Sequence, residues 1–280
     1  MKQTYSFGKY HGLGNDFIVF DGINQRIDMA HIQSISMQLC DRHFGIGADG
    51  VIIVTQSDLC DISMKIFNSD GSCPEMCGNG LRCFAAFCYE HKLVETDVFS
   101  VETDAGKMVP ALIIKEGDVV AVEIDMGVPQ VDNCLMPNNS IVHTVPILVQ
   151  DVTYDGYIVS MGNPHLVIFL DSHNHQSLDV IAETVFANPL FKNGINIELV
   201  DSLRKDYGKM VVWERGVGKT LACGTGACAA TIAGVFSSKF DRKVTIEQPG
   251  GNLLVEWQES DNHVIKTGPA KHVYDGQVML

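Results

Sequence analysis

Positive charge is scarce in this sequence. It contains 20 lysines and arginines against 34 aspartates and glutamates, which gives a formal net charge of −14 at pH 7. The basic residues form no extended run anywhere along the chain. Surfaces that bind nucleic acid or anionic membranes need clustered lysine and arginine, so the composition argues against both kinds of partner. We expect the acidic surface to serve solubility.

Long apolar segments are also missing. No stretch of 18 or more apolar residues occurs, which is the length that a transmembrane helix needs. The first residues, MKQTYSFGKYHGLGND, have neither the apolar core nor the small-residue cleavage site of a signal peptide. We therefore expect a cytoplasmic protein. With 280 residues and 46% hydrophobic content, the chain is long enough for two globular domains.

Cofactor motifs are absent as well. No phosphate-binding G-x-x-x-x-G-K-[ST] loop occurs, and the glycines at 45, 47 and 50 precede an expected strand at 51–54. A dinucleotide-binding glycine motif opens a helix instead. No lysine lies in a recognisable pyridoxal-phosphate context. We expect no cofactor.

The nine cysteines do not form a disulfide or zinc pattern. Their number is odd, and a chain of this size needs no disulfides to be stable, so we expect mostly reduced thiols. Cys73, Cys77, Cys83 and Cys88 lack the paired C-x-x-C spacing of zinc sites. A zinc site made from these four is the less favoured alternative, and we expect no metal.

Two of the cysteines lie in a segment that occurs twice. FNSDGSCPEMCGNGLRCFAA begins at Phe67, and WERGVGKTLACGTGACAA begins at Trp213. In each copy an apolar strand ends at an aromatic residue, a turn-rich loop follows, and a Cys-Gly-[Asn/Thr]-Gly segment opens an alanine-rich helix. Asn79 and Thr225 are predicted as the N-caps of these helices. Cys77 and Cys223 then lie at helix N-termini, where free N–H groups and the macrodipole favour a thiolate.

Other segments repeat in the same order. The segment 14–20 is echoed by 162–168, and 101–106 is echoed by 246–251. A repeat of this length indicates two copies of one domain and excludes a solenoid. We expect an N-terminal domain of residues 1–127 plus 268–280 that carries Cys77, and a C-terminal domain of residues 128–267 that carries Cys223.

Short apolar runs that alternate with glycine-marked turns predict mainly strands in both halves. Helical spacing is clear at 29–40 and 178–186, and single strands are expected at 99–103 and 108–114. The predicted fold class is α+β, with two pseudo-symmetric domains in which a curved, mostly antiparallel sheet or barrel surrounds a central helix.

A duplicated cysteine suggests a particular chemistry. If the two halves pack face to face, Cys77 and Cys223 meet across the interdomain cleft, where small-molecule sites tend to lie. To invert a carbon that bears hydrogen, a base must remove the proton from one face while an acid supplies one from the other. One cysteine would be a thiolate and the other a thiol, and the helix N–H groups would stabilise charge on a neighbouring carboxylate.

The motifs closely resemble those of the diaminopimelate epimerase family, which consists of amino-acid epimerases that need no cofactor. They are HGLGNDF (11–17), FNSDGSxxEMCGNGLRC (67–83), MGNPH (161–165), WERGVGKTxACGTGACA (213–229), PGG (249–251) and GPAKHVYDG (268–276). The resemblance covers essentially the whole chain. It implies two similar domains, Cys77 and Cys223 as the acid/base pair, and interconversion of LL- and meso-2,6-diaminopimelate on the route to lysine and peptidoglycan.

The resemblance also implies roles for other residues. His165 and Glu214 would tune the cysteines, and Tyr274 would lie at a homodimer contact. Backbone groups at Gly78-Asn79 and Gly224-Thr225 would bind the reacting carboxylate. The remaining substrate contacts would come from Asn15, Asn68, Asn163, Asn196, Glu214 and Arg215.

One position departs from the family pattern. Some members have glutamine where Gly50 stands, and that side chain contacts substrate; here the contact is absent. A racemase of another amino acid, such as histidine, would keep both cysteines and change the residues that bind the far end of the substrate. Because Asn68, Asn196 and Arg215 are present, we favour diaminopimelate, whose distal carboxylate an arginine can bind in a bidentate manner.

Three further alternatives are less favoured. The repeated cysteines could be buried structural residues of a duplicated domain, and Cys83 and Cys228 are expected to be packing residues of this kind. A cysteine hydrolase that uses His165 would leave the second cysteine segment unexplained. A non-catalytic protein that binds an amino acid would use the same residues without proton transfer.

Overall fold

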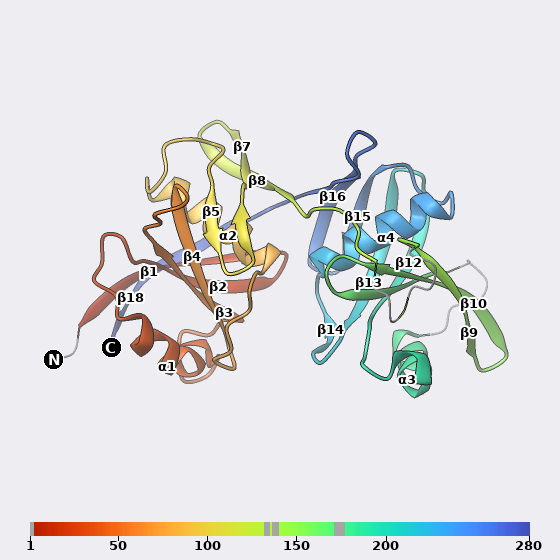
Figure 1. Ribbon diagram of the computed structural model, residues 1–280. Helices are drawn as coiled ribbons and strands as arrows, with labels where there is room; N and C mark the ends of the chain where they lie inside the picture. The colour runs from red at the N-terminus through yellow and green to blue at the C-terminus, as the bar shows by residue number, and fades with distance from the viewer. Residues whose placement is uncertain (1–2, 132–134, 136–139, 171–176) are drawn as a thin grey trace. The chain divides into compact units, whose positions relative to one another are not determined.

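The computed structural model describes residues 3–131, 135, 140–170 and 177–280 (Figure 1). The chain divides into two compact units. Unit 1 consists of Met1–Ile124 and Thr267–Leu280, and unit 2 consists of Asp125–Lys266. Each unit contains a sheet with helices, as the α+β prediction requires.

Unit 1 contains a seven-stranded sheet that the C-terminal strand completes. In spatial order its strands are β18 (Lys271–Met279), β1 (Thr4–Gly12), β2 (Asn15–Asp21), β3 (Gly50–Thr55), β4 (Ile62–Asn68), β5 (Val101–Thr103) and β6 (Gly106–Met108). The pairs β2/β3 and β4/β5 are parallel and the other pairs are antiparallel. A hairpin of β7 (Ala111–Lys115) and β8 (Asp118–Asp125) follows.

Two helices cover opposite faces of this sheet. Side chains alternate between the faces along each strand, so each helix contacts a different set of strand residues. Ile18 and Phe20 of β2 pack with α1 (Met29–Cys40) in one apolar cluster. The strand residues that alternate with this set point to the other face; among them, Ile52 of β3 faces α2 (Gly78–Glu90). From Gly80 to Cys88 every residue of α2 is buried, so α2 is the central helix that the sequence predicts.

Unit 2 is built on the same plan. Its strands, in spatial order, are β17 (Val264–Gly268), β16 (Gly251–Trp257), β15 (Lys243–Gln248), β13 (Tyr207–Glu214), β12 (Asn196–Arg204), β11 (Pro164–Phe169), β10 (Val152–Ser160) and β9 (His143–Val149), with β14 (Gly218–Thr220) paired to β13. Its helices are α3 (Leu178–Ala187), the 3-10 helix η2 (Pro189–Phe191) and α4 (Gly224–Phe236). The pairs β11/β12 and β13/β15 are parallel.

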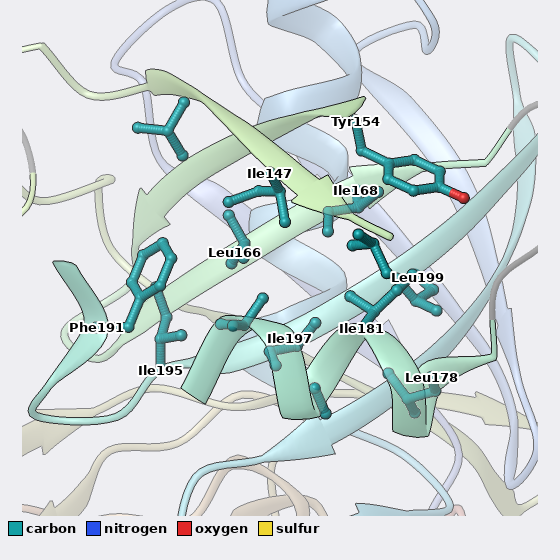
Figure 2. Close-up of a cluster of buried hydrophobic side chains, with 14 of the residues drawn as sticks. Ile147, Tyr154, Leu166, Ile168, Leu178, Ile181, Phe191, Ile195, Ile197 and Leu199 are labelled. Carbon is teal, nitrogen blue, oxygen red and sulfur yellow. The ribbon is translucent and has the colours of Figure 1, made fainter. Parts of the chain in front are cut away.

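Helix α3 closes one face of the unit 2 sheet. Ser177 caps it by accepting a hydrogen bond from the Val180 N–H. Figure 2 shows Leu178 and Ile181 of α3 among the apolar side chains of the strands, which are Ile147, Tyr154, Leu166, Ile168, Ile197 and Leu199. The residues between these on β11 and β12 therefore face the opposite side, where α4 lies.

The registers of the two units match. In β2/β3, Phe17 lies beside Gly50, and in β11/β12, His165 lies beside Asn196. Two residues further along, Ile52 of unit 1 therefore corresponds to Glu198 of unit 2. The repeat that was seen in the sequence is thus a structural correspondence of strands and helices.

Two of the expected strands differ from the prediction. The strand predicted at 108–114 is divided into β6 and β7, and Pro110 lies at the break because it has no N–H to donate to a ladder. The strand predicted at 99–103 begins only at Val101. The helices predicted at 29–40 and 178–186 are confirmed. Within the described residues no helix combines the length and apolar character needed to cross a bilayer.

Candidate active site

Cys77 is the N-cap of α2. Its backbone is extended, and its sulfur accepts a hydrogen bond from the Gly80 N–H at 3.4 Å. The prediction that Asn79 caps this helix is wrong, because Asn79 is already the second helical residue. The prediction put Cys77 two residues before the N-cap. As the N-cap itself, its sulfur lies closer to the free N–H groups of the first helical turn.

Side chains from β2 and α2 surround Cys77. The Asn15 side-chain oxygen lies 3.9 Å from the Cys77 sulfur and accepts a hydrogen bond from the Asn79 amide at 3.2 Å. The Asn15 amide in turn donates to Asp49 at 2.8 Å. Asn15, Asn79 and Cys77 are each partly exposed. The structure therefore brings Asn15 and the Cys77 segment together, as a shared site requires.

Asn68 and Gly50 lie opposite each other on β4 and β3. The Asn68 amide donates to the Ser72 hydroxyl at 2.9 Å, so the loop after β4 orients this side chain. At Gly50 a Cβ atom would lie 2.8 Å from the Phe67 carbonyl oxygen and 3.2 Å from the Phe17 ring. The observed packing thus has no room for a side chain at position 50.

In unit 2, Cys223 is the N-cap of α4 and corresponds to Cys77. Its sulfur accepts a hydrogen bond from the Gly226 N–H at 3.3 Å and lies 3.5 Å from the Thr225 hydroxyl. The prediction of Thr225 as the N-cap is wrong for the same reason as at Asn79. The Cys223 N–H donates to the side-chain oxygen of Gln248 at 2.7 Å.

Cys223 is much more enclosed than Cys77, since only 5% of its surface is exposed. Burial, followed by the nearby carboxylates of Glu214 and Glu198, raises the pKa of the Cys223 thiol well above its usual range. The hydrogen bonds from Thr225 and Gly226 act in the opposite direction but are smaller effects. At Cys223 the effect of the helix N-terminus is thus opposed by burial and by the neighbouring carboxylates.

His165 is fully buried on β11 and takes part in a chain of hydrogen bonds that reaches Cys223. Its Nδ1 lies 2.6 Å from the Glu198 carboxylate, and its Nε2 lies 3.1 Å from the Asn163 side-chain oxygen. The Asn163 amide donates to the Thr225 hydroxyl at 3.4 Å. The chain thus leads from Glu198 to the Cys223 sulfur and includes two of the residues that the sequence predicts, His165 and Asn163.

Of the residues expected to bind the far end of the substrate, Asn196, Glu214 and Arg215 lie around the end of β13, whereas Asn68 lies on β4 of unit 1. The Asn196 amide donates to the Pro164 carbonyl at 2.9 Å, and its oxygen accepts from the Arg215 N–H at 2.9 Å. The Arg215 side chain is exposed, with its methylene groups against Gly194. Glu214 accepts a hydrogen bond from the Thr220 hydroxyl. Asn196 therefore fixes the backbone from which Arg215 projects.

Sequence reasoning missed two buried polar residues of this region, Glu198 and Gln248. Glu198 lies within the segment INIELV, where polar and apolar residues alternate at first, so the sequence predicts that its side chain is exposed on one face of a strand. Gln248 precedes the PGG motif at the end of β15 and accepts the Cys223 N–H. Both residues are almost fully buried, at 0% and 4% exposure. A useful signal was available in the repeat, since the position equivalent to Glu198 is the apolar Ile52.

The described residues include one grouping with the composition of a metal site. His165, Glu198 and Cys223 each offer a ligand atom within 4.8 Å of the others. Their atoms also take part in the hydrogen bonds given above. Within the same described part of the chain, Cys73, Cys77, Cys83 and Cys88 form no such grouping, and Cys83 and Cys88 are fully buried in α2. The alternative of a zinc site made from these four is therefore not supported.

The described cysteines are all free thiols, and Cys134 lies outside the described residues. Cys83 and Cys228 are completely buried, as expected for packing residues. Burial raises the pKa of the Cys83 thiol to about 12 and that of the Cys228 thiol to about 11.

Tyr274 lies on β18, an edge strand of the unit 1 sheet. Its ring contacts Phe7 with centroids 6.1 Å apart, and 43% of its surface is exposed. The role expected of it in a homodimer stays a prediction.

The family model described as Diaminopimelate epimerase matches residues 7–131 and 157–273 of the chain. A curated relative of that name from Nostoc punctiforme is 45% identical, and the match covers 99% of this chain and 100% of the relative. Another from Moorella thermoacetica is 43% identical, with 98% of this chain and 99% of the relative covered. The resemblance recognised in the motifs is thus confirmed.

Solved structures of more distant proteins share the fold. A phenazine biosynthesis protein of the PhzF family from Bacillus anthracis matches with a TM-score of 0.70 at 16% identity, covering 99% of this chain and 100% of that chain. A hydroxyproline epimerase from Agrobacterium vitis matches with a TM-score of 0.67 at 14% identity, covering 100% and 92%. These matches confirm the predicted α+β architecture. Because the family model and the curated relatives extend over nearly the whole sequence, the chain belongs to the diaminopimelate epimerase family.

Proposed function

We propose that this chain interconverts LL- and meso-2,6-diaminopimelate, a step of lysine biosynthesis, by a two-base mechanism that needs no cofactor. Membership in the family over nearly the full length supports the reaction. The single observation that carries the mechanism is the matched placement of two sulfurs. Cys77 and Cys223 are the N-caps of equivalent helices in equivalent units.

In the proposed reaction one cysteine, as thiolate, removes the α-proton from one face of the substrate. The other cysteine, as thiol, delivers a proton to the opposite face, and the two exchange roles in the reverse direction. Atoms and charge balance, because each turnover transfers one proton to a sulfur and one from a sulfur. This mechanism requires both units to bring their cysteines to one substrate molecule, which stays a prediction.

The helix N-termini have a second proposed role. Removal of the α-proton moves negative charge onto the substrate carboxylate, and N–H groups at Gly78-Asn79 and Gly224-Thr225 would stabilise that charge. Asn15 and Asn163, which contact Asn79 and Thr225, would orient the α-amino group. His165 and Glu214 would adjust the proton affinity of the cysteines.

The distal amino-acid end of diaminopimelate would bind at Asn68, Asn196, Glu214 and Arg215. The exposed guanidinium of Arg215 is suited to a bidentate contact with the distal carboxylate. We further propose a cytoplasmic homodimer with Tyr274 at the contact between subunits.

An assay of the purified protein, without added cofactor or metal, tests the reaction. LL-diaminopimelate should be converted to the meso isomer, while histidine, proline and lysine should not be racemised. Racemisation of histidine in preference to diaminopimelate would replace the proposed substrate. A non-catalytic binding protein would change none of the four compounds.

Cysteine variants test the mechanism in the same assay. Cys77→Ala and Cys223→Ala should each lower kcat by about a thousandfold or more, since each removes one proton-transfer group. Cys60→Ala, which changes a partly exposed cysteine outside the site, is the matched control and should behave like wild type. Full activity of either site variant would contradict the two-base mechanism.

A further inference from the structure

Glu198 is a buried acidic residue to which the family resemblance assigned no role. Its side chain has no exposed surface, and burial raises the pKa of its carboxyl group. One of its oxygens contacts His165 Nδ1, and within the described residues the other has no hydrogen-bond partner. Burying a carboxyl group with one unsatisfied oxygen is costly, so its presence here calls for an explanation.

The duplicated fold provides an internal comparison. The positions of His165 and Glu198 in unit 2 are those of Phe17 and Ile52 in unit 1. Both pairs lie on the sheet face that packs against the cysteine-bearing helix. Unit 1 therefore builds the same strand pair and the same helix with two apolar side chains, so the fold itself does not require the polar pair.

The contact with the helix is also equivalent. A Cβ atom added at Gly80 of α2 would lie 3.3 Å from the Ile52 Cδ1 atom, which is closer than an ordinary van der Waals contact. At Gly226 of α4 the added Cβ atom would lie 2.6 Å from a Glu198 carboxylate oxygen. Glu198 thus fills the place of Ile52, directly beneath the first turn of α4, and a glycine at position 226 gives it room.

Glu198 reaches Cys223 in two ways. The hydrogen-bond chain through His165, Asn163 and Thr225 ends at the Cys223 sulfur. One proton must lie between Glu198 and His165 Nδ1, whichever of the two carries it, so Glu198 fixes the orientation of the ring. A carboxyl oxygen of Glu198 also lies within 4.8 Å of the Cys223 sulfur.

Titratable groups lie near Cys223 on four strands. They are His165 on β11, Glu198 on β12, Glu214 on β13 and Lys266 on β17. Glu214 and Glu198 oppose ionisation of the thiol, whereas the Lys266 ammonium lies against Gly224, where an added Cβ would be 2.5 Å from Nζ. Unit 1 has no counterpart of Glu198 at Ile52, so the surroundings of the two cysteines differ.

We propose that Glu198 is a positioning residue for proton transfer at Cys223: through its contact with His165 it holds the hydrogen-bond chain of His165, Asn163 and Thr225 in place against the Cys223 sulfur. This inference rests on the proposed epimerase function. Glu198 makes the surroundings of the two cysteines unequal, because unit 1 has the apolar Ile52 at the equivalent position. Glu198 acts through other side chains and need not touch the substrate.

Two substitutions separate the charge from the hydrogen bond. Glu198→Ile introduces the residue that unit 1 has at this position and removes both. Glu198→Gln removes the charge and keeps a side chain that can bond to His165. The exposed Glu256 on β16, which pairs with Lys243 at 2.7 Å, supplies the control Glu256→Gln.

The first measurement is the pH dependence of alkylation at each cysteine, followed by peptide mass spectrometry. In Glu198→Ile the profile of Cys223 should shift by about one pH unit, because the hydrogen-bond chain that ends at its sulfur has lost its anchor, and in Glu198→Gln most of the wild-type profile should return. The profile of Cys77 in the same sample should not move. An unchanged Cys223 profile in Glu198→Ile, or an equal shift at both cysteines, would overturn the proposal.

The second measurement is the rate with diaminopimelate. Glu198→Ile should lower kcat about tenfold while KM changes less than about threefold, and Glu198→Gln should recover most of the loss, because the hydrogen bond to His165 is retained. A folded Glu198→Ile enzyme with wild-type kcat would overturn the positioning role. If the wild-type protein itself does not act on diaminopimelate, the proposed function fails, while the alkylation profiles still test the effect of Glu198 on Cys223.

Discussion

At the scale of single residues, the two proposed catalytic cysteines share a backbone position but not an environment. Both are N-caps whose sulfur accepts an N–H from the third helical residue. Cys77 is partly exposed beside Asn15 and Asn79, whereas Cys223 is buried near two carboxylates. The motif Cys-Gly-[Asn/Thr]-Gly predicts the shared position. The difference comes from burial and from Glu214 and Glu198, of which Glu198 is distant from Cys223 in sequence and approaches it only in the folded sheet.

Gln248 provides a prediction at this scale. Its oxygen accepts the buried Cys223 N–H, and Gln248→Leu would leave that N–H without a partner. We expect a loss of about 1–3 kcal/mol in the free energy of unfolding and a lower kcat, since the cysteine segment loses its anchor. Urea unfolding and the epimerase assay measure the two effects. Asn252→Leu, at an exposed position on β16, serves as the control. Equal stability of the two variants would contradict the anchoring role.

The buried cysteines lead to a prediction about alkaline pH. Burial raises the pKa of Cys40 and Cys228 to about 11 and that of Cys83 to about 12, from 9.0. Above pH 9 the unfolded chain loses these protons while the folded chain keeps them, so stability falls as pH rises. Each such thiol should lower the free energy of unfolding by about 1.4 kcal/mol per pH unit.

Denaturant titrations at pH 8, 9.5 and 10.5 measure this decline. Cys228→Ala should reduce the slope between the two higher pH values, because one titrating group is removed. A slope that is the same in wild type and Cys228→Ala would show that this thiol does not contribute.

At the scale of elements, each cysteine-bearing helix is buried on one face of a sheet, and a second helix covers the other face. Alternation along β11 and β12 places Leu166 and Ile197 toward α3 and the polar residues His165 and Glu198 toward α4. The packing of α3 therefore determines which strand residues can reach Cys223. A shift of either strand by one residue would exchange the two sets.

The α3 interface can be tested by a core substitution. Ile181 is fully buried among the side chains shown in Figure 2, and Ile181→Ala should cost about 2–5 kcal/mol by leaving a cavity. Thermal unfolding measures the loss. Val211→Ala, at a position on β13 with 41% exposure, should cost much less. Similar losses for the two variants would show that α3 does not make the core contact described here.

Much of this element structure could be predicted from the sequence, because periodicity is a local property. The helix at 29–40 and the repeat of the cysteine segment are visible without coordinates. The N-caps were placed two residues too late, since asparagine and threonine are the stronger capping residues and cysteine is rarely considered. The expected strand 108–114 was divided at Pro110, which the apolar pattern alone does not reveal. Glu198 could not be assigned, because its partners come from other strands.

At the scale of the whole molecule, gene duplication explains why each of two similar units has a cysteine at the N-cap of its central helix. The units keep the same strand registers and differ at the polar pair beneath the helix. A symmetric protein would give both sulfurs the same proton affinity, whereas proton transfer between two faces needs one donor and one acceptor. His165 and Glu198 in unit 2, against Phe17 and Ile52 in unit 1, are a difference that can make the two sulfurs unequal.

The two-base proposal requires Cys77 and Cys223 to approach one another. Disulfides form only when Cα atoms come within ~7 Å, so mild oxidation should link the two cysteines and abolish activity. Dithiothreitol should restore activity. Peptide mapping without reductant identifies the bond, and Cys60→Ala should give the same product. Oxidation that links other cysteines, or that leaves activity intact, would contradict the required approach.

The most direct test of the two-base claim is deuterium incorporation at low conversion. When LL-diaminopimelate reacts in deuterium oxide, the meso product should carry deuterium at the inverted carbon, while recovered LL substrate should remain unlabelled, because a different sulfur delivers the new proton. Mass spectrometry of the separated isomers measures both labels. Deuterium that appears equally in recovered substrate and product, or product that retains the original hydrogen, would contradict the account.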